Sequence, residues 1–401
     1  TAVVISGTPV TDANCNGANN GSITINANGG TGTLQYSIDN GATYQTTNTF
    51  SSLSPGSNNI VVQDANGCTT TTTANITEPT AVVINGTPVT DANCNGANNG
   101  AITINANGGT GTLQYSIDNG VTYQSGNVFS SLSPGSYNIV VQDANGCTTT
   151  ATANITEPTA VVISGTPVTD ANCNGANNGS ITINANGGTG TLQYSIDNGA
   201  TYQSGNVFSS LSPGSYNIVV QDANGCTTTA TANITEPTAV VINGTPVTDA
   251  NCNGANNGAI TINANGGTGT LQYSIDNGVT YQSGNVFSSL SPGSYNIVVQ
   301  DANGCTTTAT ANITEPTAVV ISGTPVTDVN CNGANNGSIT INANGGAGTL
   351  QYSIDNGSTY QASNTFSSLS PGSYNIVVQD ANGCTATGTA NITEPTAVVI
   401  S

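Results

Sequence analysis

Only two kinds of side chain in this 401-residue chain could carry out chemistry, namely its twenty acidic residues and its ten cysteines. The sequence has no Lys, Arg or His, so it lacks the usual general bases and the cations that bind an oxyanion. The net charge of −20 also argues against binding to nucleic acid or to an anionic membrane, because no cation is present to displace counterions from phosphate groups. The composition predicts a structural or binding protein rather than an enzyme.

A pair of carboxylates could still hydrolyse glycosides, because two acids at a defined separation suffice for that reaction. The acids here sit in turn sequences, and each repeating segment carries the same four; Asp12, Asp39, Asp64 and Glu78 are the first set. A small domain also has little room for a substrate cleft. We therefore expect no enzymatic activity.

The cysteine spacing shows that the chain is repetitive. One series is Cys15, Cys94, Cys173, Cys252 and Cys331, the other is Cys68, Cys147, Cys226, Cys305 and Cys384, and both recur at the same constant interval. This period predicts five domains, at residues 1–79, 80–158, 159–237, 238–316 and 317–395. Residues 396–401 repeat the opening sequence and start a sixth, so we expect the segment to belong to a longer array.

Within one repeat the apolar residues alternate with a period of two. Residues 22–26 and 34–38 alternate polar and apolar side chains, and Gly29-Gly30 and Asp39-Asn40-Gly41 provide turns. Further strands are expected at residues 2–5, 43–45, 49–53, 59–64 and 69–77. About seven short strands and no amphipathic helix predict an all-β fold, a tandem array of immunoglobulin-like β-sandwich domains.

Two local patterns support a sandwich. Tyr137 follows a Pro-Gly turn and precedes a strand, as in a tyrosine corner, where the hydroxyl bonds back to the backbone. Repeat 1 has Asn58 at this position, so its corner should be weaker. In the last strand, Thr70 and Thr72 share the parity of Ile76 and should face inward, which leaves the alternate threonines in solvent.

The cysteines predict disulfides formed in an oxidising compartment, because the chain has no histidine and no C-x-x-C spacing for zinc. We expect each bond to lie within one repeat, because a small sandwich with a thin core needs its own covalent link. The expected pairs are Cys15–Cys68, Cys94–Cys147, Cys173–Cys226, Cys252–Cys305 and Cys331–Cys384. The alternative, Cys68–Cys94 and its equivalents, would join neighbouring repeats.

The motifs of each unit resemble the SprB repeat of Bacteroidetes surface proteins. In repeat 1 these motifs are Cys15-Asn16-Gly17, Asn20-Gly21-Ser22-Ile23, Gly29-Gly30-Thr31-Gly32, Tyr36-Ser37-Ile38, Leu53-Ser54-Pro55-Gly56, Val62-Gln63-Asp64-Ala65-Asn66-Gly67-Cys68 and Ile76-Thr77-Glu78-Pro79. The resemblance implies a large secreted cell-surface adhesin of the gliding-motility type, exported by type IX secretion. It implies no catalytic residue.

Calcium is the one cofactor that the acidic residues suggest. Carboxylate and amide oxygens in loops suit Ca²⁺, and the candidate ligands are Asp64 with Asn66, and Glu78 with Asp91 across the junction between repeats 1 and 2. The alternative is turn chemistry, in which these side chains accept hydrogen bonds from nearby backbone amides. In that case the chain needs no cofactor.

Sugars are the other ligands to consider. One tyrosine per repeat lies in a polar stretch where its ring could stack on a sugar; these are Tyr44, Tyr123, Tyr202, Tyr281 and Tyr360. Tyr36, in contrast, has the parity of a core residue. One N-x-T sequon per repeat is a candidate glycosylation site; the asparagines are Asn75, Asn154, Asn233, Asn312 and Asn391. Ordinary strand composition explains the sequons equally well.

The linker between repeats is only Glu78-Pro79-Thr80 and its equivalents. Because proline restricts both its own φ and the residue before it, we expect an extended rod in which each repeat touches its neighbours. The leading hypothesis is the shaft or filament of an extracellular, secreted surface adhesin. The alternatives are repeats that themselves bind extracellular polysaccharide, and chains that assemble laterally into a fibre through edge strands. No membrane-inserting segment is expected.

Overall fold

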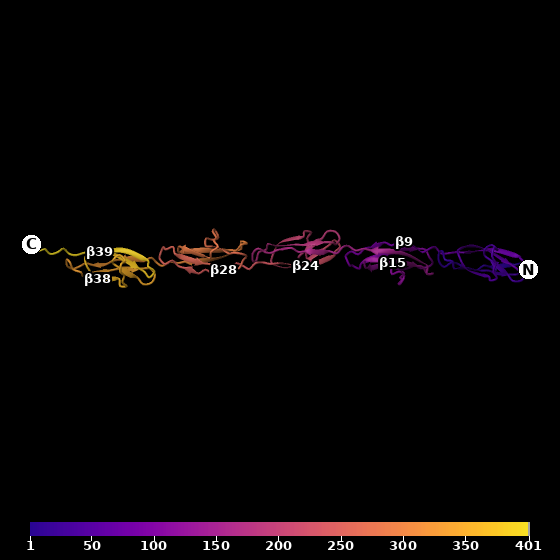
Figure 1. Ribbon diagram of the computed structural model, residues 1–401, viewed down its shortest axis with the longest axis horizontal. Helices are drawn as coiled ribbons and strands as arrows, with labels where there is room; N and C mark the ends of the chain where they lie inside the picture. Colours follow the sequence, from indigo (N-terminus) through magenta and orange to yellow (C-terminus); the bar gives the residue numbers. More distant parts are fainter. Residues whose placement is uncertain (400–401) are drawn as a thin grey trace. The chain divides into compact units, whose positions relative to one another are not determined.

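The computed structural model describes residues 1–399 and is built from strands and loops (Figure 1). No helix occurs among these residues. They therefore contain no helix that is long and apolar enough to span a membrane. The structure has forty strands, eight in each repeat. The last two residues of the predicted start of a sixth repeat, 400–401, lie outside the described part.

Repeat 2 illustrates the pattern that recurs in all five. Its strands are β9 (Val83–Gly86), β10 (Val89–Thr90), β11 (Gly100–Thr103), β12 (Asn105–Asn107), β13 (Gln114–Ser116), β14 (Val128–Leu132), β15 (Gly135–Gln142) and β16 (Thr148–Ile155). In the other repeats the strands begin and end at the equivalent positions, so that the first strand of the chain, β1, is Val4–Gly7 and the last, β40, is Thr385–Ile392.

Each repeat has two three-stranded antiparallel sheets and a two-stranded ribbon. In repeat 2 the sheets are β10-β11-β14 and β13-β15-β16, and the ribbon is β9-β12. The longest pairing is the β15–β16 hairpin, in register from Gly135↔Ile155 to Gln142↔Thr148. Residues 143–147 form the turn at its tip.

The core lies between the two sheets. In repeat 2 the fully buried residues include Ile102 on β11, Ile139 and Val141 on β15, and Ile155 on β16, together with Ile104 just after β11. Burial alternates along β16, so that its threonines at 148, 150 and 152 are exposed and the residues between them are more buried. The predicted all-β immunoglobulin-like sandwich class is confirmed, and so is the inward parity predicted for the last strand.

The turn between β13 and β14 forms as predicted. Asn119 and Gly120 have positive φ values of 64° and 81°. The buried Ser116 donates from its Oγ to Asp118 Oδ1 at 2.6 Å and accepts from the Gly120 N–H at 2.9 Å. Asp118 also accepts from the hydroxyl of Thr122 at 2.5 Å. A buried serine and an aspartate thus stabilise the turn.

The predicted tyrosine corner is also confirmed. The hydroxyl of Tyr137 donates to the backbone oxygen of Ser133 at 2.8 Å, and Tyr295 and Tyr374 make the same bond at 2.7 and 2.8 Å. In repeat 1 the side chain of Asn58 donates to Gly56 O at 3.2 Å instead. That shorter side chain bonds within the same strand and does not reach back across the turn.

Apart from shifts of a few residues at strand ends, the strand predictions differ from the structure in three places. The strand expected at 22–26 is two strands, β3 (Gly21–Thr24) and β4 (Asn26–Asn28), because Ile25 leaves the ladder and the chain changes partner from β6 (Thr49–Leu53) to β1. Residues 43–45 make only an isolated bridge, Tyr36↔Gln45. The short β2 (Val10–Thr11) carried no alternating pattern and was not expected.

The described chain forms two compact units. One consists of Thr1–Thr166, Ile183–Asn206 and Tyr216–Thr231; the other consists of Pro167–Thr182, Val207–Ser215 and the chain from Ala232 onward. Repeats 1 and 2 belong to the first unit, and repeats 4 and 5 to the second. The predicted repeat boundaries and the extended rod stay predictions.

Candidate functional site at the repeat junctions

Disulfides join each repeat to the next one along the chain. The first cysteine of a repeat bonds to the second cysteine of the following repeat, always 132 residues later; the bonds are Cys15–Cys147, Cys94–Cys226, Cys173–Cys305 and Cys252–Cys384. Each bond joins two residues of the same compact unit. Because each bond links one repeat to the next, the four disulfides connect repeats 1 to 5 in series.

The prediction of bonds within a repeat, such as Cys15–Cys68 and Cys94–Cys147, is wrong. In repeat 2, Cys147 directly precedes β16, whereas the loop of Cys94 lies at the other end of that strand, where the Ala92 N–H donates to Thr156 O at 3.0 Å. Eight strand residues separate the two positions by about 27 Å, far beyond the reach of a disulfide.

The alternative pairing, Cys68–Cys94, is wrong for the same reason. It would bond Cys68 of repeat 1 to the first cysteine of repeat 2, which lies at the far end of that repeat. Cys94 lies at the end of repeat 2 that leads into repeat 3, and it bonds to Cys226 of that repeat. A disulfide with this sequence separation of 132 stabilises the fold by about 5 kcal/mol in the chain-entropy model.

The loop that carries Cys15 is held against the linker that follows repeat 1. The side chain of Asn16 donates to Pro79 O at 3.2 Å, and the Gly17 N–H donates to Glu78 Oε2 at 2.5 Å. The side chains of Asn14 and Asn20 also bond to each other. The linker and the cysteine loop therefore form one bonded structure at the end of the repeat.

The turn that carries Cys147 is organised by a buried carboxylate. Asp143 Oδ1 accepts from the N–H groups of Asn145 and Cys147 at 2.9 and 2.8 Å, and Oδ2 accepts from the N–H of Thr110 at 2.8 Å. Burial by itself raises the pKa of Asp143, but the backbone donors outweigh it and hold this pKa below its usual value. The carboxylate is therefore ionised and fixes the turn.

A glycine brings this turn close to the linker. Gly109 precedes Thr110, has a φ of 69°, and donates from its N–H to Thr80 O at 2.8 Å. A Cβ atom at this position would lie 2.7 Å from both the Cβ of Asp143 and a methyl group of Val82. Only glycine therefore permits this approach.

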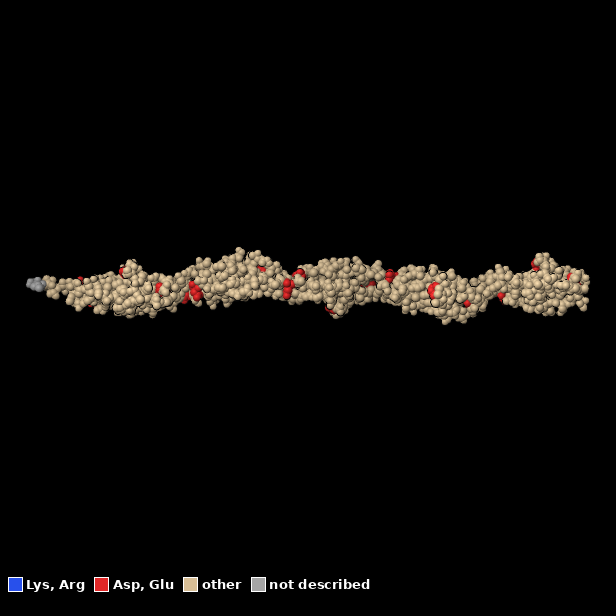
Figure 2. Space-filling model, turned by 60° about the horizontal axis from the view of Figure 1, so that its bottom comes forward, with Lys and Arg blue, Asp and Glu red and all other residues tan. Residues whose placement is uncertain are grey.

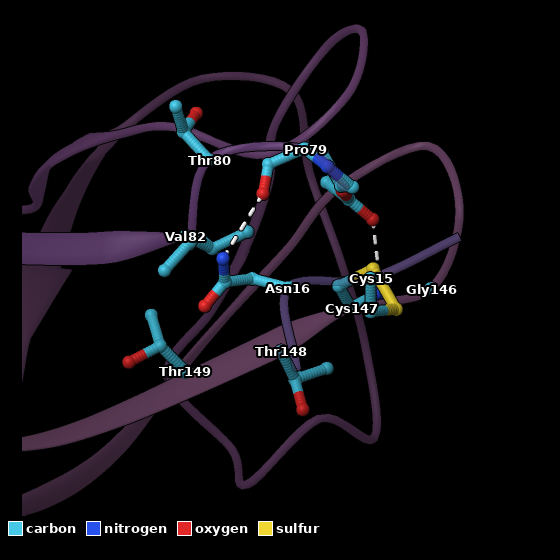
Figure 3. Close-up of a pocket in the computed structure, with 11 residues that line it drawn as sticks. Cys15, Asn16, Pro79, Thr80, Val82, Gly146, Cys147, Thr148 and Thr149 are labelled. Carbon is cyan, nitrogen blue, oxygen red and sulfur yellow. Dashed lines mark hydrogen bonds between the residues drawn. A yellow bond between two sulfur atoms is a disulfide. The ribbon is translucent and has the colours of Figure 1, made fainter. Parts of the chain in front are cut away.

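Two contacts beside the disulfide join the repeats directly. The side chain of Asn145 donates to the backbone oxygen of Asn14 at 2.9 Å, and Cys147 Sγ lies 3.3 Å from the same oxygen. A hollow at this junction is lined by the Cys15 loop, the linker at 79–82 and residues 146–149 (Figure 3). An equivalent hollow beside Cys173 and Cys305 is lined by the same segments of repeats 3 and 4.

The four acidic side chains of repeat 1 all accept backbone hydrogen bonds. Asp64 accepts from the N–H groups of Thr31, Asn66 and Cys68 at 2.9, 3.0 and 2.9 Å. The donors are led by Thr31, and they lower the pKa of Asp64. Asp12 accepts from Thr77, Asp39 from Thr43 and Glu78 from Gly17. The bonds from Asn66 and Cys68 to Asp64 and from Thr43 to Asp39 are the local ones that the turn interpretation predicts. Asp12 and Glu78 instead accept from residues 65 and 61 positions away in the chain, which that interpretation did not predict.

The structure does not bring the predicted calcium ligands Glu78 and Asp91 together. Asp91 accepts from the N–H of Thr156 at 2.7 Å, at the far end of repeat 2, whereas Glu78 belongs to the end of repeat 1. No cluster of three or more acidic, His or Cys side chains occurs within residues 1–399, and Figure 2 shows the acidic residues in separate places on the visible face. Calcium binding stays a prediction. A rise in Tm when Ca²⁺ is added would support it, and an unchanged Tm would contradict it.

The predicted sugar contacts are only partly accessible. Tyr123 and Tyr202 are 37% and 38% exposed, and the equivalent tyrosines of the other repeats are half-buried. Tyr36 packs against the core, as its parity predicts. The five sequon asparagines, Asn75 and its equivalents, are exposed on the outer face of the last strand. Sugar binding and glycosylation stay predictions.

The sequence predicted no contact between repeats for three junction residues: Asn14 and Asn16 in the cysteine loop, and Asn145 as the partner of Asn14. Asn145 is the repeat 2 equivalent of Asn66, which the sequence suggested as a calcium ligand. The only sequence signal for these residues was that both cysteines lie in Asn-rich motifs present in every repeat.

Comparison with known proteins identifies the repeat. The family model described as SprB repeat matches the chain five times, at residues 7–43, 86–122, 165–201, 244–280 and 323–359. No curated protein sequence matches the chain.

Solved structures with a detectable likeness include a set of Ig domains, a cadherin-type ectodomain and an S-layer protein. The N-terminal eight Ig domains of Down Syndrome Cell Adhesion Molecule are 12% identical, with a TM-score of 0.25; the alignment covers 98% of this chain and 61% of that one. The human Desmocollin-1 ectodomain is 14% identical, with a TM-score of 0.23 and coverage of 90% and 92%. The S-layer protein rSbsC is 13% identical, with a TM-score of 0.19 and coverage of 100% and 68%. Likeness at this level carries no argument about function.

Proposed function

We propose, from the premise that this chain is a tandem array of SprB repeats, that it forms a tension-bearing shaft of a secreted bacterial surface adhesin. The family match and the disulfides support a repeat-based structural role outside the cytosol, where disulfides persist. The adhesin role and export by type IX secretion belong to this proposal. The observation that carries it is the series of disulfides between successive repeats.

These bonds limit how far the chain can be stretched. The shortest covalent path from Cys15 to Cys384 uses the bonds Cys15–Cys147, Cys173–Cys305 and Cys252–Cys384. Its peptide portions, residues 147–173 and 252–305, are together only as long as a single repeat. Without disulfides the same two ends are separated by the whole peptide from position 15 to position 384. Even if every sandwich unfolded, the oxidised segment would extend to roughly 270 Å instead of roughly 1,250 Å.

The array is also redundant. If the Cys94–Cys226 bond is lost, the path described above remains complete, and if Cys173–Cys305 is lost, a path of equal length runs through Cys94–Cys226. A single reduced internal bond therefore leaves the maximum extension unchanged. This property suits a surface fibre that is pulled repeatedly.

Force spectroscopy on single chains, held by handles at the two ends, tests the proposal. We expect the oxidised chain to lengthen by about 1,000 Å less than the reduced chain, over the segment from Cys15 to Cys384. The double variant C94S/C226S should behave as the oxidised parent, since the parallel path remains. Equal lengthening of the oxidised and reduced chains would contradict the proposal.

A further inference from the structure

Asparagine followed by glycine occurs several times in each repeat, and the two residues of such a pair can react with each other. The backbone nitrogen of the glycine attacks Cγ of the asparagine and displaces ammonia, and glycine favours the attack because it has no Cβ to obstruct the approach. Repeat 2 contains six such pairs, whose asparagines are Asn85, Asn95, Asn99, Asn107, Asn119 and Asn145. The structure distinguishes these pairs by what holds the attacking nitrogen.

In five of the six pairs the attacking nitrogen is restrained. Three of the glycines donate from this N–H to an oxygen; the bonds are Gly96 to Glu157 Oε2 at 2.5 Å, Gly120 to Ser116 Oγ at 2.9 Å and Gly146 to Asp143 O at 3.1 Å. Two glycines lie inside strands, Gly86 in β9 and Gly100 in β11. The nitrogen must first leave its bond or its strand, which slows the attack.

Asn107 differs because neither of its two reacting groups is engaged in a hydrogen bond. It is the last residue of β12, it is exposed, and its side chain makes no hydrogen bond within residues 1–399. The N–H of Gly108 has no acceptor in the same part of the chain. The equivalent asparagines of the other repeats are exposed in the same way; they are Asn28, Asn186, Asn265 and Asn344.

The fold requires the glycine that makes Asn107 reactive. Gly108 has a φ of 85°, and a Cβ atom at this position would lie 1.8 Å from the backbone oxygen of Ala81 in the linker. A residue with a side chain would protect Asn107 from attack, but it does not fit here. The reactive pair is therefore a consequence of how the linker packs.

The residues after position 107 connect the linker to the turn that carries the second cysteine. The Gly109 N–H donates to Thr80 O, and the Thr110 N–H donates to Asp143 Oδ2, both at 2.8 Å. The first bond holds the linker and the second holds the carboxylate that fixes the turn. A longer backbone at position 107 would displace both of these bonds.

We infer that Asn107 and its four equivalents deamidate in the folded chain, and that the isoaspartate formed loosens the junction. The Gly108 nitrogen loses its proton to hydroxide and bonds to Cγ, and the side-chain nitrogen takes a proton from water and leaves as ammonia. Water then opens the cyclic imide at Cγ to give aspartate, or at the backbone carbonyl to give isoaspartate. Each conversion consumes one water and releases one ammonia, and isoaspartate adds one methylene to the main chain.

The first test follows the six pairs in the oxidised 401-residue chain during storage in mildly alkaline buffer. Peptide mass spectrometry measures the conversion of each pair, and it reports Asn107 together with Asn265 because repeats 2 and 4 have the same sequence. We expect Asn107 to convert about 2- to 10-fold faster than the pairs that must first lose a hydrogen bond. After reduction and unfolding in urea, all six should convert at similar rates. Equal rates in the folded chain would overturn the inference.

The second test measures what isoaspartate does to the junction. In the aged parent, dithiothreitol should reduce Cys15–Cys147 several-fold faster than in the fresh chain. Asn107→Gln would need a larger ring and reacts far more slowly, so it should keep the fresh rate. Its matched control, Asn105→Gln, changes an exposed residue of the same strand and should age as the parent does. Equal ageing of N107Q and the parent would overturn the inference.

A third variant separates the new charge from the longer backbone. Fresh Asn107→Asp carries the added carboxylate without the extra methylene, so its Cys15–Cys147 bond should be reduced at nearly the rate of the fresh parent. A rate as high as that of the aged parent would show that the charge, and not isoaspartate, loosens the junction, and would overturn that part of the inference.

Discussion

The side chain of Asn145 in repeat 2 donates a hydrogen bond to the backbone oxygen of Asn14 in repeat 1, 2.9 Å away and 131 residues earlier in the chain. The equivalent pairs, Asn224 with Asn93, Asn303 with Asn172 and Asn382 with Asn251, make the same bond at 2.9 to 3.0 Å. This contact accompanies each disulfide and orients the two cysteine loops.

Replacing Asn145 with alanine should loosen the first junction. The change removes one exposed hydrogen bond, worth about 0.5–1 kcal/mol, and should speed the reduction of Cys15–Cys147 by dithiothreitol by about 2- to 5-fold. Mass spectrometry of alkylated peptides gives the rate for each bond. The matched control is N66A, in the same turn of repeat 1, where the side chain makes no hydrogen bond to another repeat among the described residues. An equal effect of both variants would refute the role of the contact.

The tyrosine corner should contribute measurable stability. Tyr137→Phe removes the hydrogen bond from the hydroxyl to Ser133 O and should lower the free energy of unfolding of repeat 2 by about 1 kcal/mol. Asn58→Tyr introduces the corner into repeat 1 and should raise it by a similar amount. Urea unfolding followed by tyrosine fluorescence measures both, and Tyr123→Phe is a control away from the corner.

Glycine at position 109 should be required for the junction to form. Gly109→Ala combines an unfavourable positive φ with contacts of 2.7 Å to Asp143 and Val82. Gly96→Ala has a similar φ of 73° and open space around the new methyl group. We expect a loss of about 1–2 kcal/mol for G96A and about 1–3 kcal/mol more for G109A.

The difference between the two glycine variants should appear in the melting temperature. It should also appear in the yield of the Cys15–Cys147 bond after oxidative refolding, because the turn of Asp143 cannot approach the linker when residue 109 carries a methyl group. Equal losses for the two variants would show that this close approach does not matter.

Acid should destabilise the repeats through their turn aspartates. Hydrogen bonds from Ser37 and Thr43 lower the pKa of Asp39 to about 2, and the equivalent bonds lower the pKa of Asp118. Because the pKa is lower in the folded state than in the unfolded state, this stabilisation is complete above the unfolded value near 4. It is lost as the pH falls from about 4 towards 2.

A threonine variant isolates this effect. Thr122→Val removes the hydroxyl that donates to Asp118 Oδ2, so the pKa of Asp118 should rise towards its ordinary value and the stability lost between pH 4 and 2 should become smaller. Thr152→Val, on the exposed face of β16, makes the same chemical change without an aspartate partner. Thermal melts at several pH values compare the two variants, and identical pH dependence would refute the assignment.

The local structure of one repeat follows from the sequence because its signals are local. Alternating side chains predict the strands around Ile23 and Tyr36, and the shared parity of Thr70, Thr72 and Ile76 predicts which face of the last strand is buried. The position of Tyr137 after Pro-Gly predicts its corner. The break at Ile25 was missed because a change of pairing partner leaves the alternation intact.

The cysteines show where the sequence stops being sufficient. Composition and spacing alone determined that the chain consists of repeats and that it lacks basic residues, and they predicted the disulfides that eight of its ten cysteines form. The choice of partner was decided by the tertiary structure, because an eight-residue strand places Cys94 and Cys147 at opposite ends of one sandwich. The short linker then brings Cys15 of one repeat beside Cys147 of the next. The spacing of two cysteines along the chain contains no information about which end of a folded domain each of them occupies.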